Sequence, residues 1–251
     1  MLKRGFFLTG FTLKSLLRNK TIVFSSLILP ILTLLSTWWV TVDELMSFEL
    51  QNNEQLYQSM KDVHILTGAL TAVAITSGII SYILTVENNM ISPRLKITGY
   101  TQLEISLSLL VSIFTILSLA NISTFLLSLL LFWPKNPAGV LVAILFTTII
   151  YTVFGFFIGF YFTKIMEGTL IVLIFSFIDL MMISNPMGGE IYLKPWTKFF
   201  PGFWPTQIVL HAGFLDDPFY YWGPILWTLA ISLVLLIIPQ LKSLLYNKGG
   251  H

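Results

Sequence analysis

The feature that most constrains this chain is a succession of long apolar runs without lysine, arginine, aspartate or glutamate. Residues 105–132 and 138–163 are the two longest of them. A helix rises 1.5 Å per residue, so about 20 residues suffice to cross the hydrocarbon core of a bilayer. Backbone polar groups in a bilayer must be satisfied internally, and we therefore expect these runs to be transmembrane helices.

The composition indicates the same class of protein. Hydrophobic residues make up 55% of the chain and charged residues 10%, with a mean hydropathy of +0.83. Soluble domains carry about 25% charged residues, so a water-soluble fold is excluded. The chain has no cysteine, which rules out disulfides and thiolate chemistry, and its net charge of +2 does not suggest nucleic-acid binding.

We expect one all-α membrane domain over residues 1–251, with six transmembrane helices. The predicted spans cover residues 21–42, 63–86, 105–132, 138–163, 169–184 and 222–241. A G-x-x-x-G pattern at Gly155 and Gly159 indicates close helix packing in the fourth span.

Residues 1–20 are predicted to form an amphipathic helix on the lipid headgroups, and we expect it to be retained, not cleaved as a secretory signal. Leucines fall mostly on one arc of this helix and cations on another, although Phe7 and Phe11 share the basic arc. The cations with an expected role at the interface are Lys3, Arg4, Lys14 and Arg18.

The distribution of positive charge predicts the orientation. With the N-terminus inside, ten of the 14 lysines and arginines lie in cytoplasmic segments and four lie outside. Residues 43–62, between the first two spans, are acidic and are expected outside. The positive-inside rule then places both termini in the cytoplasm.

A polar segment separates the second and third spans at residues 87–102, and we expect it to be a cytoplasmic loop. A break at Ser92-Pro93 precedes a short stretch that presents cations beside apolar side chains. The residues expected to contact a partner are Glu87, Ser92, Pro93, Arg94, Leu95, Lys96, Ile97 and Thr98.

This segment resembles the permease subunits of the ABC-2 type of ABC exporter. In that family a glutamate ends the second span, and a pattern like Arg-x-Leu-x-x-Thr-Pro follows in a coupling helix that docks on the ATPase subunit. Here Arg94 opens the pattern, and Thr98 is followed by Gly99 instead of proline. A related fragment at residues 167–170 lies between the fourth and fifth spans and is interpreted as coincidence.

Residues 185–221 contain proline-punctuated apolar pieces that are too short to cross a bilayer. They resemble the re-entrant external hairpin of the same family, in which an apolar patch and a proline step precede a short helix. The residues that carry this resemblance are Phe199, Phe200, Pro201, Phe203, Trp204 and Pro205.

The resemblance implies a subunit that does not itself hydrolyse ATP. No G-x-x-x-x-G-K-[ST] phosphate loop is present in the sequence, so we do not expect the chain to be an enzyme or to hold a cofactor or metal. ATP and Mg²⁺ would belong to two copies of a separate ATPase subunit. The other expected partners are a second permease, identical or paralogous, and the lipid of a bacterial cell membrane, with no nucleic acid.

Asp179 is the acid predicted inside a span, where a charge costs about 2.5–3.5 kcal/mol. Two interpretations stay open: it lines a translocation path together with Asn121, or it is hydrogen-bonded between helices. Its partner could be Asn121, a serine, water or a group on a second permease. His64, His211 and His251 are scattered and show neither metal-ligand nor triad spacing.

The expected function is outward transport of an amphiphile, such as an antimicrobial peptide or a lipophilic drug, driven by the separate ATPase. A polysaccharide or teichoic-acid exporter of the same type stays open, because aromatic rings also stack on sugars. From other classes, a secondary transporter or a non-transporting membrane scaffold is the alternative. Secondary transporters more often show several intramembrane ionisable groups or inverted repeats.

Overall fold

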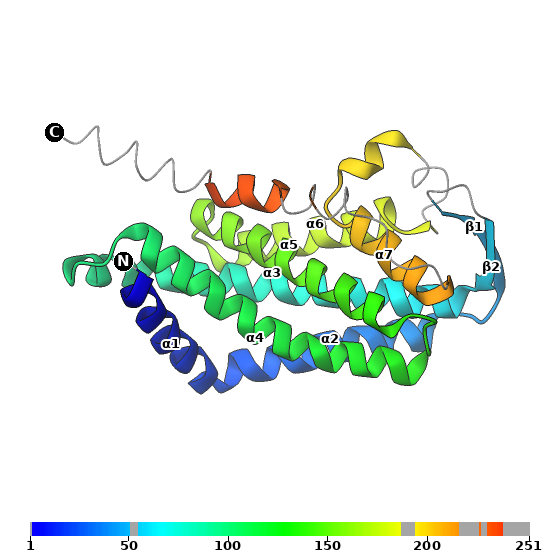
Figure 1. Ribbon diagram of the computed structural model, residues 1–251, viewed down its shortest axis with the longest axis horizontal. Coiled ribbons are helices and arrows are strands. Elements are labelled where there is room, and N and C mark those ends of the chain that lie inside the picture. The colour runs from blue at the N-terminus through cyan, green and yellow to red at the C-terminus, as the bar shows by residue number, and fades with distance from the viewer. Residues whose placement is uncertain (1, 51–54, 187–193, 216–225, 227–229, 238–251) are drawn as a thin grey trace.

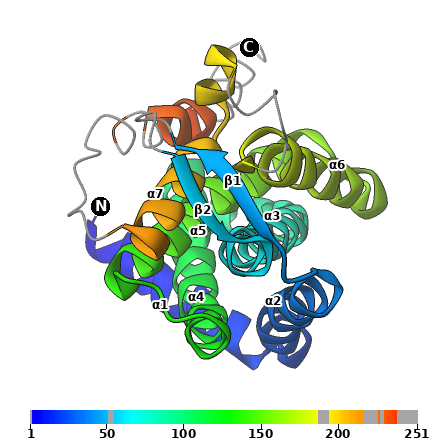
Figure 2. The same ribbon diagram turned by 90° about the vertical axis from the view of Figure 1, so that its right-hand side faces the viewer.

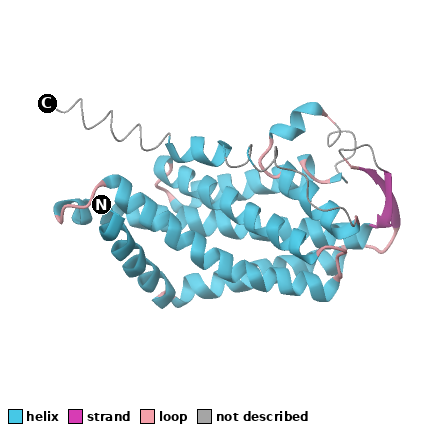
Figure 3. Cartoon of the chain, viewed as in Figure 1, coloured by secondary structure: helices cyan, strands magenta, loops and turns pink. Residues whose placement is uncertain are grey.

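Five helices are long and apolar enough to cross a membrane in the computed structural model, which describes residues 2–50, 55–186, 194–215, 226 and 230–237. They are α2 (Lys20–Val40), α3 (Met60–Ile97), α4 (Gln102–Leu131), α5 (Pro137–Tyr161) and α6 (Ile165–Phe177), the last continued by the π-helical segment η1 (Ile178–Ile183). The chain is thus an all-α, multi-pass membrane protein (Figures 1 and 3). The predicted sixth span, residues 222–241, falls largely outside the described residues, although 230–237 are helical.

Shorter elements complete the described chain. They are α1 (Leu2–Arg18), the strands β1 (Leu45–Glu49) and β2 (Gln55–Ser59), the 3₁₀ helix η3 (Pro195–Phe199) and α7 (Phe203–Phe214). The antiparallel hairpin β1–β2 corrects the expectation of a plain acidic loop over residues 43–62. Phe48 explains why a hairpin forms there: its ring is buried against the ring of Phe214 on α7, so one face of the hairpin covers the end of the bundle.

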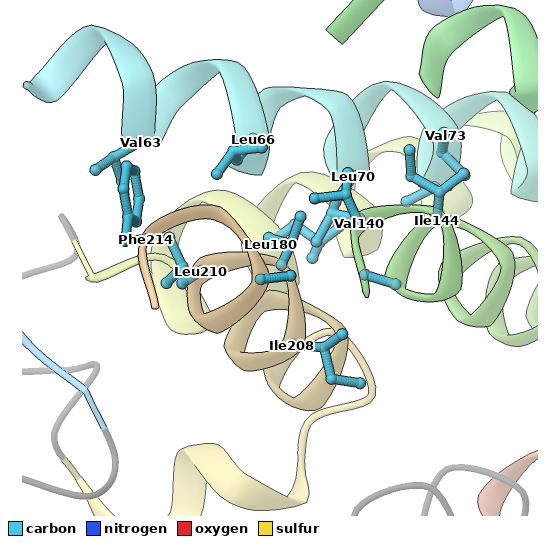
Figure 4. Close-up of a cluster of buried hydrophobic side chains, with 14 of the residues drawn as sticks. Val63, Leu66, Leu70, Val73, Val140, Ile144, Leu180, Ile208, Leu210 and Phe214 are labelled. Atoms are coloured by element: carbon cyan, nitrogen blue, oxygen red, sulfur yellow. The ribbon is translucent and has the colours of Figure 1, made fainter. Parts of the chain in front are cut away.

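Helix α3 lies at the centre of the bundle, with the other long helices around it when the molecule is seen end-on (Figure 2). In its most apolar stretch 83% of the residues are buried, against 17% in α2 and 28% in α6. The largest core cluster joins α3 to α5, η1 and α7, with side chains such as Leu70, Ile144, Leu180 and Leu210 pointing toward one another (Figure 4). Helices α2 and α6 are therefore the least covered of the five described spans.

Glycine brings α3 and α5 together. A Cβ atom built on Gly155 would collide with the carbonyl oxygen of Gly78, and one built on Gly159 would lie 2.6 Å from Cβ of Thr85. Only glycine permits backbones to approach so closely. The prediction that the G-x-x-x-G pattern serves packing within the chain is confirmed.

The end of α3 corrects a second expectation. Residues 87–97 are not a loop with a break at Ser92-Pro93, because α3 continues as one helix of 38 residues to Ile97. Pro93 has no N–H to donate to the carbonyl of Asn89, and the hydroxyl of Ser92 donates to that carbonyl instead, at 3.3 Å. The carbonyl of Asn89, which cannot receive a hydrogen bond from Pro93, therefore still has a donor.

The helix stops at Gly99, whose φ of +87° is in the left-handed region. The N–H of Tyr100 donates to the carbonyl of Leu95 and the N–H of Gly99 to that of Lys96, which is a Schellman motif. Thr101 then begins α4 with a capping box closed by Glu104. The turn between α3 and α4 is consequently only a few residues long.

Segments expected on one side of the membrane gather at one end of the bundle. Helix α1, the last turns of α3 and the α5–α6 turn lie at the end opposite the β1–β2 hairpin (Figure 1). The hairpin, η3, α7 and the α4–α5 turn lie toward the other end, where Lys135 and Asn136 donate their backbone N–H groups to carbonyls of α7. The two groups match the predicted cytoplasmic and external sets.

Candidate functional site

The terminal turns of α3, residues 87–97, form an exposed stub that extends beyond the packed bundle. Glu87, Arg94 and Lys96 are exposed, and none of the three forms an ion pair with another described residue. Ile97 is 87% exposed and lies beside these two cations. We name residues 87–97 the α3 stub.

Of the other residues predicted for this site, some are buried and stabilise the helix, and others are exposed. Ser92 is buried and supplies the hydrogen bond that carries the helix past Pro93, so its role is structural. Leu95 is half-buried, whereas Pro93 and Thr98 are exposed. Arg94, Lys96 and Ile97 thus lie exposed in the last turn of α3. At about 100° per residue, Arg94 and Ile97 share one side of the helix, whereas Lys96 points away from Arg94. Contact of these residues with a partner stays a prediction.

Two side chains that sequence analysis did not single out fasten α3 to the turn between α5 and α6. The hydroxyl of Tyr82 donates to the carbonyl of Lys164 at 2.8 Å and lies 3.3 Å from that of Phe162. The side-chain amide of Asn89 donates to the carbonyl of Gly159 at 3.0 Å. These carbonyls at the end of α5 and in the turn that follows it receive their bonds from α3.

Gly168, in the first turn of α6, makes room for this connection. A Cβ atom at Gly168 would overlap the ring of Tyr82. Helix α6 begins at Ile165, earlier than the predicted start at residue 169, and an exposed ion pair of 2.8 Å joins Lys164 to Glu167 beside it. Of the fragment at residues 167–170, Gly168 therefore packs against Tyr82 of α3, whereas Glu167 and Leu170 are exposed.

Asp179 lies in η1 and is completely buried. Its Oδ2 atom accepts from the hydroxyl of Tyr151 at 2.7 Å and from the backbone N–H of Gly202 at 3.0 Å, and its Oδ1 atom accepts from the hydroxyl of Ser184 at 3.0 Å. Of the partners considered from sequence, a serine is present. Tyr151 and Gly202 were not foreseen, because neither is near Asp179 in sequence.

The Asp179 node, formed by Asp179, Tyr151, Ser184 and Gly202, joins three parts of the chain. Tyr151 belongs to α5, Ser184 follows η1, and Gly202 precedes α7. A Cβ atom at Gly202 would stand 2.8 Å from Oδ1 of Asp179, so the backbone can approach the carboxyl group only because residue 202 is glycine. π-Helical turns such as η1 occur frequently at functional sites.

Asn121 belongs to a separate network. Its amide donates to the hydroxyls of Thr148 at 2.9 Å and Ser77 at 3.2 Å, which links α4 to α5 and α3. It is fully buried and makes no hydrogen bond to Asp179. The geometry of both residues is that of ties between helices, and a role in a translocation path stays a prediction.

The predicted external residues around η3 and α7 are mixed in exposure. Phe203 and Pro205 are buried, Phe200, Pro201 and Trp204 are half-buried, and Phe199 is 65% exposed. Apart from Trp204, every residue of α7 is buried. This short apolar helix is therefore a core element, packed against α5 and α3.

Helix α1 packs on α4 through buried Leu8 and a contact of 3.3 Å between the hydroxyls of Thr12 and Ser108. Lys14 and Arg18 are exposed on the opposite face, together with Phe7 and Phe11. The exposed face therefore mixes aromatic and basic groups, and a purely basic face is not present. The side chains of Lys3 and Arg4 lie outside those that the structure describes.

Among the described residues no group of three or more histidines, cysteines and acids is placed to hold a metal ion. His64 is half-buried on α3 and His211 is buried on α7, whereas His251 lies outside the described part. A search of protein-family models and a search of curated proteins each found no match to this chain.

One hollow of about 600 Å³ lies at the hairpin end of the bundle. Its walls are the last turns of α2, the first turns of α3 and η1, which contributes Met181. We name it the α2–α3 groove. Its volume is in the range that holds a drug-sized molecule.

Proposed function

We propose that this chain is the permease subunit of an ATP-driven exporter of the ABC-2 type, powered by a separate ATPase. The observation that carries the proposal is the α3 stub, in which exposed Arg94, Lys96 and Ile97 stand at the end of the helix that is the most buried of the five described spans. An exposed arginine beside an exposed apolar side chain suits a docking surface for another protein, because arginines and apolar anchors contribute much of the binding energy at interfaces.

Helix α3 is suited to transmit a push. Its 38 residues correspond to about 57 Å, against about 30 Å for the hydrocarbon core. The helix continues without interruption from the stub to the hairpin end, so a displacement at Ile97 would move the whole of α3. Because Tyr82 and Asn89 fasten α3 to the α5–α6 turn, α6 would move with it.

The motion would then reach the Asp179 node, since η1 continues α6. There the carboxyl group holds Gly202, the residue before α7. ATP-driven closure of two ATPase copies would thus shift α7 and the segment around it at the far end. Such coupling requires that the partner contact the two states differently.

The complete arrangement in the proposal has six spans, cytoplasmic termini and a re-entrant region over residues 185–221. Ten of 14 cations fall on the side assigned to the cytoplasm, and the α3 stub lies at the same end as α1. A second permease, identical or paralogous, would cover α2 and α6, the two least covered helices. The substrate would be an amphiphile that leaves a bacterial cell across its membrane.

The test reverses the two cations of the stub. The genes that flank this one are first searched for a phosphate-loop ATPase. When the variant Arg94→Glu with Lys96→Glu is co-expressed with that ATPase, the association should weaken by at least about tenfold. Substrate-stimulated ATP hydrolysis should fall with it. The matched control is Lys194→Glu with Lys198→Glu, which makes the same charge change at exposed positions of the opposite end.

Two results would refute the proposal. One is a wild-type chain that retains no ATPase on purification. The other is a stub variant that binds the ATPase and transports as well as the control variant does.

A further inference from the structure

The α2–α3 groove has an apolar lining with a single acidic group. Val40 and Val42 come from α2 and the residues after it, Met60 from α3 and Met181 from η1. Glu44 is the charged residue among those that line the groove. A hollow of this kind complements a molecule with an apolar body and one positive charge.

The hydroxyls in the lining do not alter this character. Ser36 and Thr37 each donate to the carbonyl of Thr33, and Thr41 donates to the carbonyl of Thr37, at 2.7–2.9 Å. Their hydrogens are used within α2. Their oxygen atoms can still accept a hydrogen bond but carry no charge, and His64 adds an imidazole ring to the lining. The carboxylate of Glu44 is therefore the lining group that would select a cation.

Glu44 is held in position but its carboxylate is free. Its backbone carbonyl accepts from the N–H of Met60 at 2.7 Å, which fixes residue 44 beside the start of α3. Its side chain is exposed and forms no ion pair with a described residue. The neighbouring acid, Asp43, accepts instead from the hydroxyl of Ser59 at 2.5 Å.

The nearest cation in the sequence is occupied elsewhere. The ammonium group of Lys61 lies 4.6 Å from the centre of the Trp38 ring, in a cation–π contact. Trp38 packs with Leu34 and Ile65 toward α4, and neither Lys61 nor Trp38 lines the groove. Glu44 thus has no counter-ion among the described residues.

We propose that the α2–α3 groove binds a lipophilic monovalent cation, with the carboxylate of Glu44 as its counter-ion. Val40, Val42, Met60 and Met181 contact the apolar body of the ligand, and His64 also lines the groove. The binding site itself is independent of any ATPase. Its use as the substrate site of an exporter, with a cationic amphiphile as substrate, rests on the proposed function.

The test uses two probes of nearly equal shape and opposite charge, tetraphenylphosphonium and tetraphenylborate. The purified chain in phosphatidylcholine nanodiscs is titrated with each probe by equilibrium dialysis, and binding to empty nanodiscs is subtracted. We expect the wild type to prefer the cation. The Glu44→Gln variant should bind tetraphenylphosphonium about three- to tenfold more weakly and the anion no more weakly.

Two further variants distinguish binding in the groove from non-specific attraction of the cation to surface charge. Glu49→Gln removes an acid of the same hairpin that does not line the groove, and it should bind tetraphenylphosphonium as the wild type does. Val40→Trp fills the groove from a side chain that is 77% exposed, so the fold should tolerate it while binding of both probes falls.

Equal affinity of the wild type for the two probes would overturn the proposal, and so would equal losses in Glu44→Gln and Glu49→Gln. Either result would leave the ATPase experiment on the α3 stub unaffected, because that experiment changes residues at the opposite end of the molecule. A wild-type chain that retains no ATPase on purification but binds the cationic probe selectively would refute the exporter and keep the site.

Discussion

Replacing Asp179 by asparagine and by leucine should separate a structural tie from an electrostatic role. An asparagine whose amide oxygen takes the place of Oδ2 still accepts from Tyr151 and Gly202. Its NH₂ group then faces the hydroxyl of Ser184, which can turn to accept. Asp179→Asn therefore preserves all three hydrogen bonds, whereas Asp179→Leu leaves three buried donors without a partner.

The size of the difference follows from that count. Side-chain hydrogen bonds in membrane proteins average about 0.6 kcal/mol and reach about 1.7 kcal/mol. Three of them give about 2–5 kcal/mol of lost stability for Asp179→Leu. The cost for Asp179→Asn should stay below about 1 kcal/mol, because only the charge assistance of the bonds is lost.

The assay is thermal unfolding of the purified chain in detergent, followed by transport in vesicles. At about 2–4 °C per kcal/mol for a chain of this size, Asp179→Leu should lower Tm by at least about 4 °C. Equal Tm values for the leucine variant and the wild type would refute the reasoning. A stable asparagine variant that no longer transports would show that the charge itself acts in the transport cycle.

Two other perturbations test how the helices are joined. Tyr82→Phe keeps the ring beside Gly168 but removes the hydroxyl that bonds to the carbonyl of Lys164. Backbone amides of the α5–α6 turn should then exchange faster with deuterium. Unchanged exchange would contradict a stabilising role for this hydrogen bond. Gly155→Ala introduces a Cβ that meets the carbonyl of Gly78 and should lower the free energy of unfolding. Gly10→Ala, where the new Cβ meets nothing within 4 Å, should raise it by up to about 1 kcal/mol, and a loss at both glycines would argue against the packing explanation.

The long helices could be predicted because their physical cause is local. A run of 20 or more apolar residues has to form a helix in a bilayer, whatever its neighbours are. The helices α4 and α5 begin and end within three residues of the predicted spans 105–132 and 138–163. Thr101 and Asn136 at their starts are caps that accept backbone N–H groups, which is also a local signal.

The predictions that were wrong concern places where a local signal was overridden. Ser92-Pro93 suggests a break, but the helix continues through it, and the hydroxyl of Ser92 gives the Asn89 carbonyl the hydrogen bond that Pro93 cannot donate. The acidic segment over residues 43–62 gives no strong strand pattern. The hairpin there depends on Phe48 packing on Phe214, a contact between residues far apart in the chain.

The candidate site was only partly accessible from the sequence for the same reason. Asp179 was noticeable because a carboxyl group in an apolar run is costly. Its donors come from α5 and from the residue before α7, and no spacing rule connects these with residue 179. Tyr82 gave no signal, since one tyrosine in a span is ordinary and the carbonyl acceptors of its hydroxyl are backbone atoms.

The two networks on α5 suggest how one end of the molecule could influence the other. Thr148 holds Asn121 of α4, and Tyr151, one turn further along, holds Asp179 of η1. Helix α5 is fixed to α3 through Gly155, so it cannot slide independently. A push on the α3 stub would therefore move α3, α4 and α5 together, and α6 with them, because α6 is attached at its start through Tyr82 and packs on Gly78 of α3 through Val172.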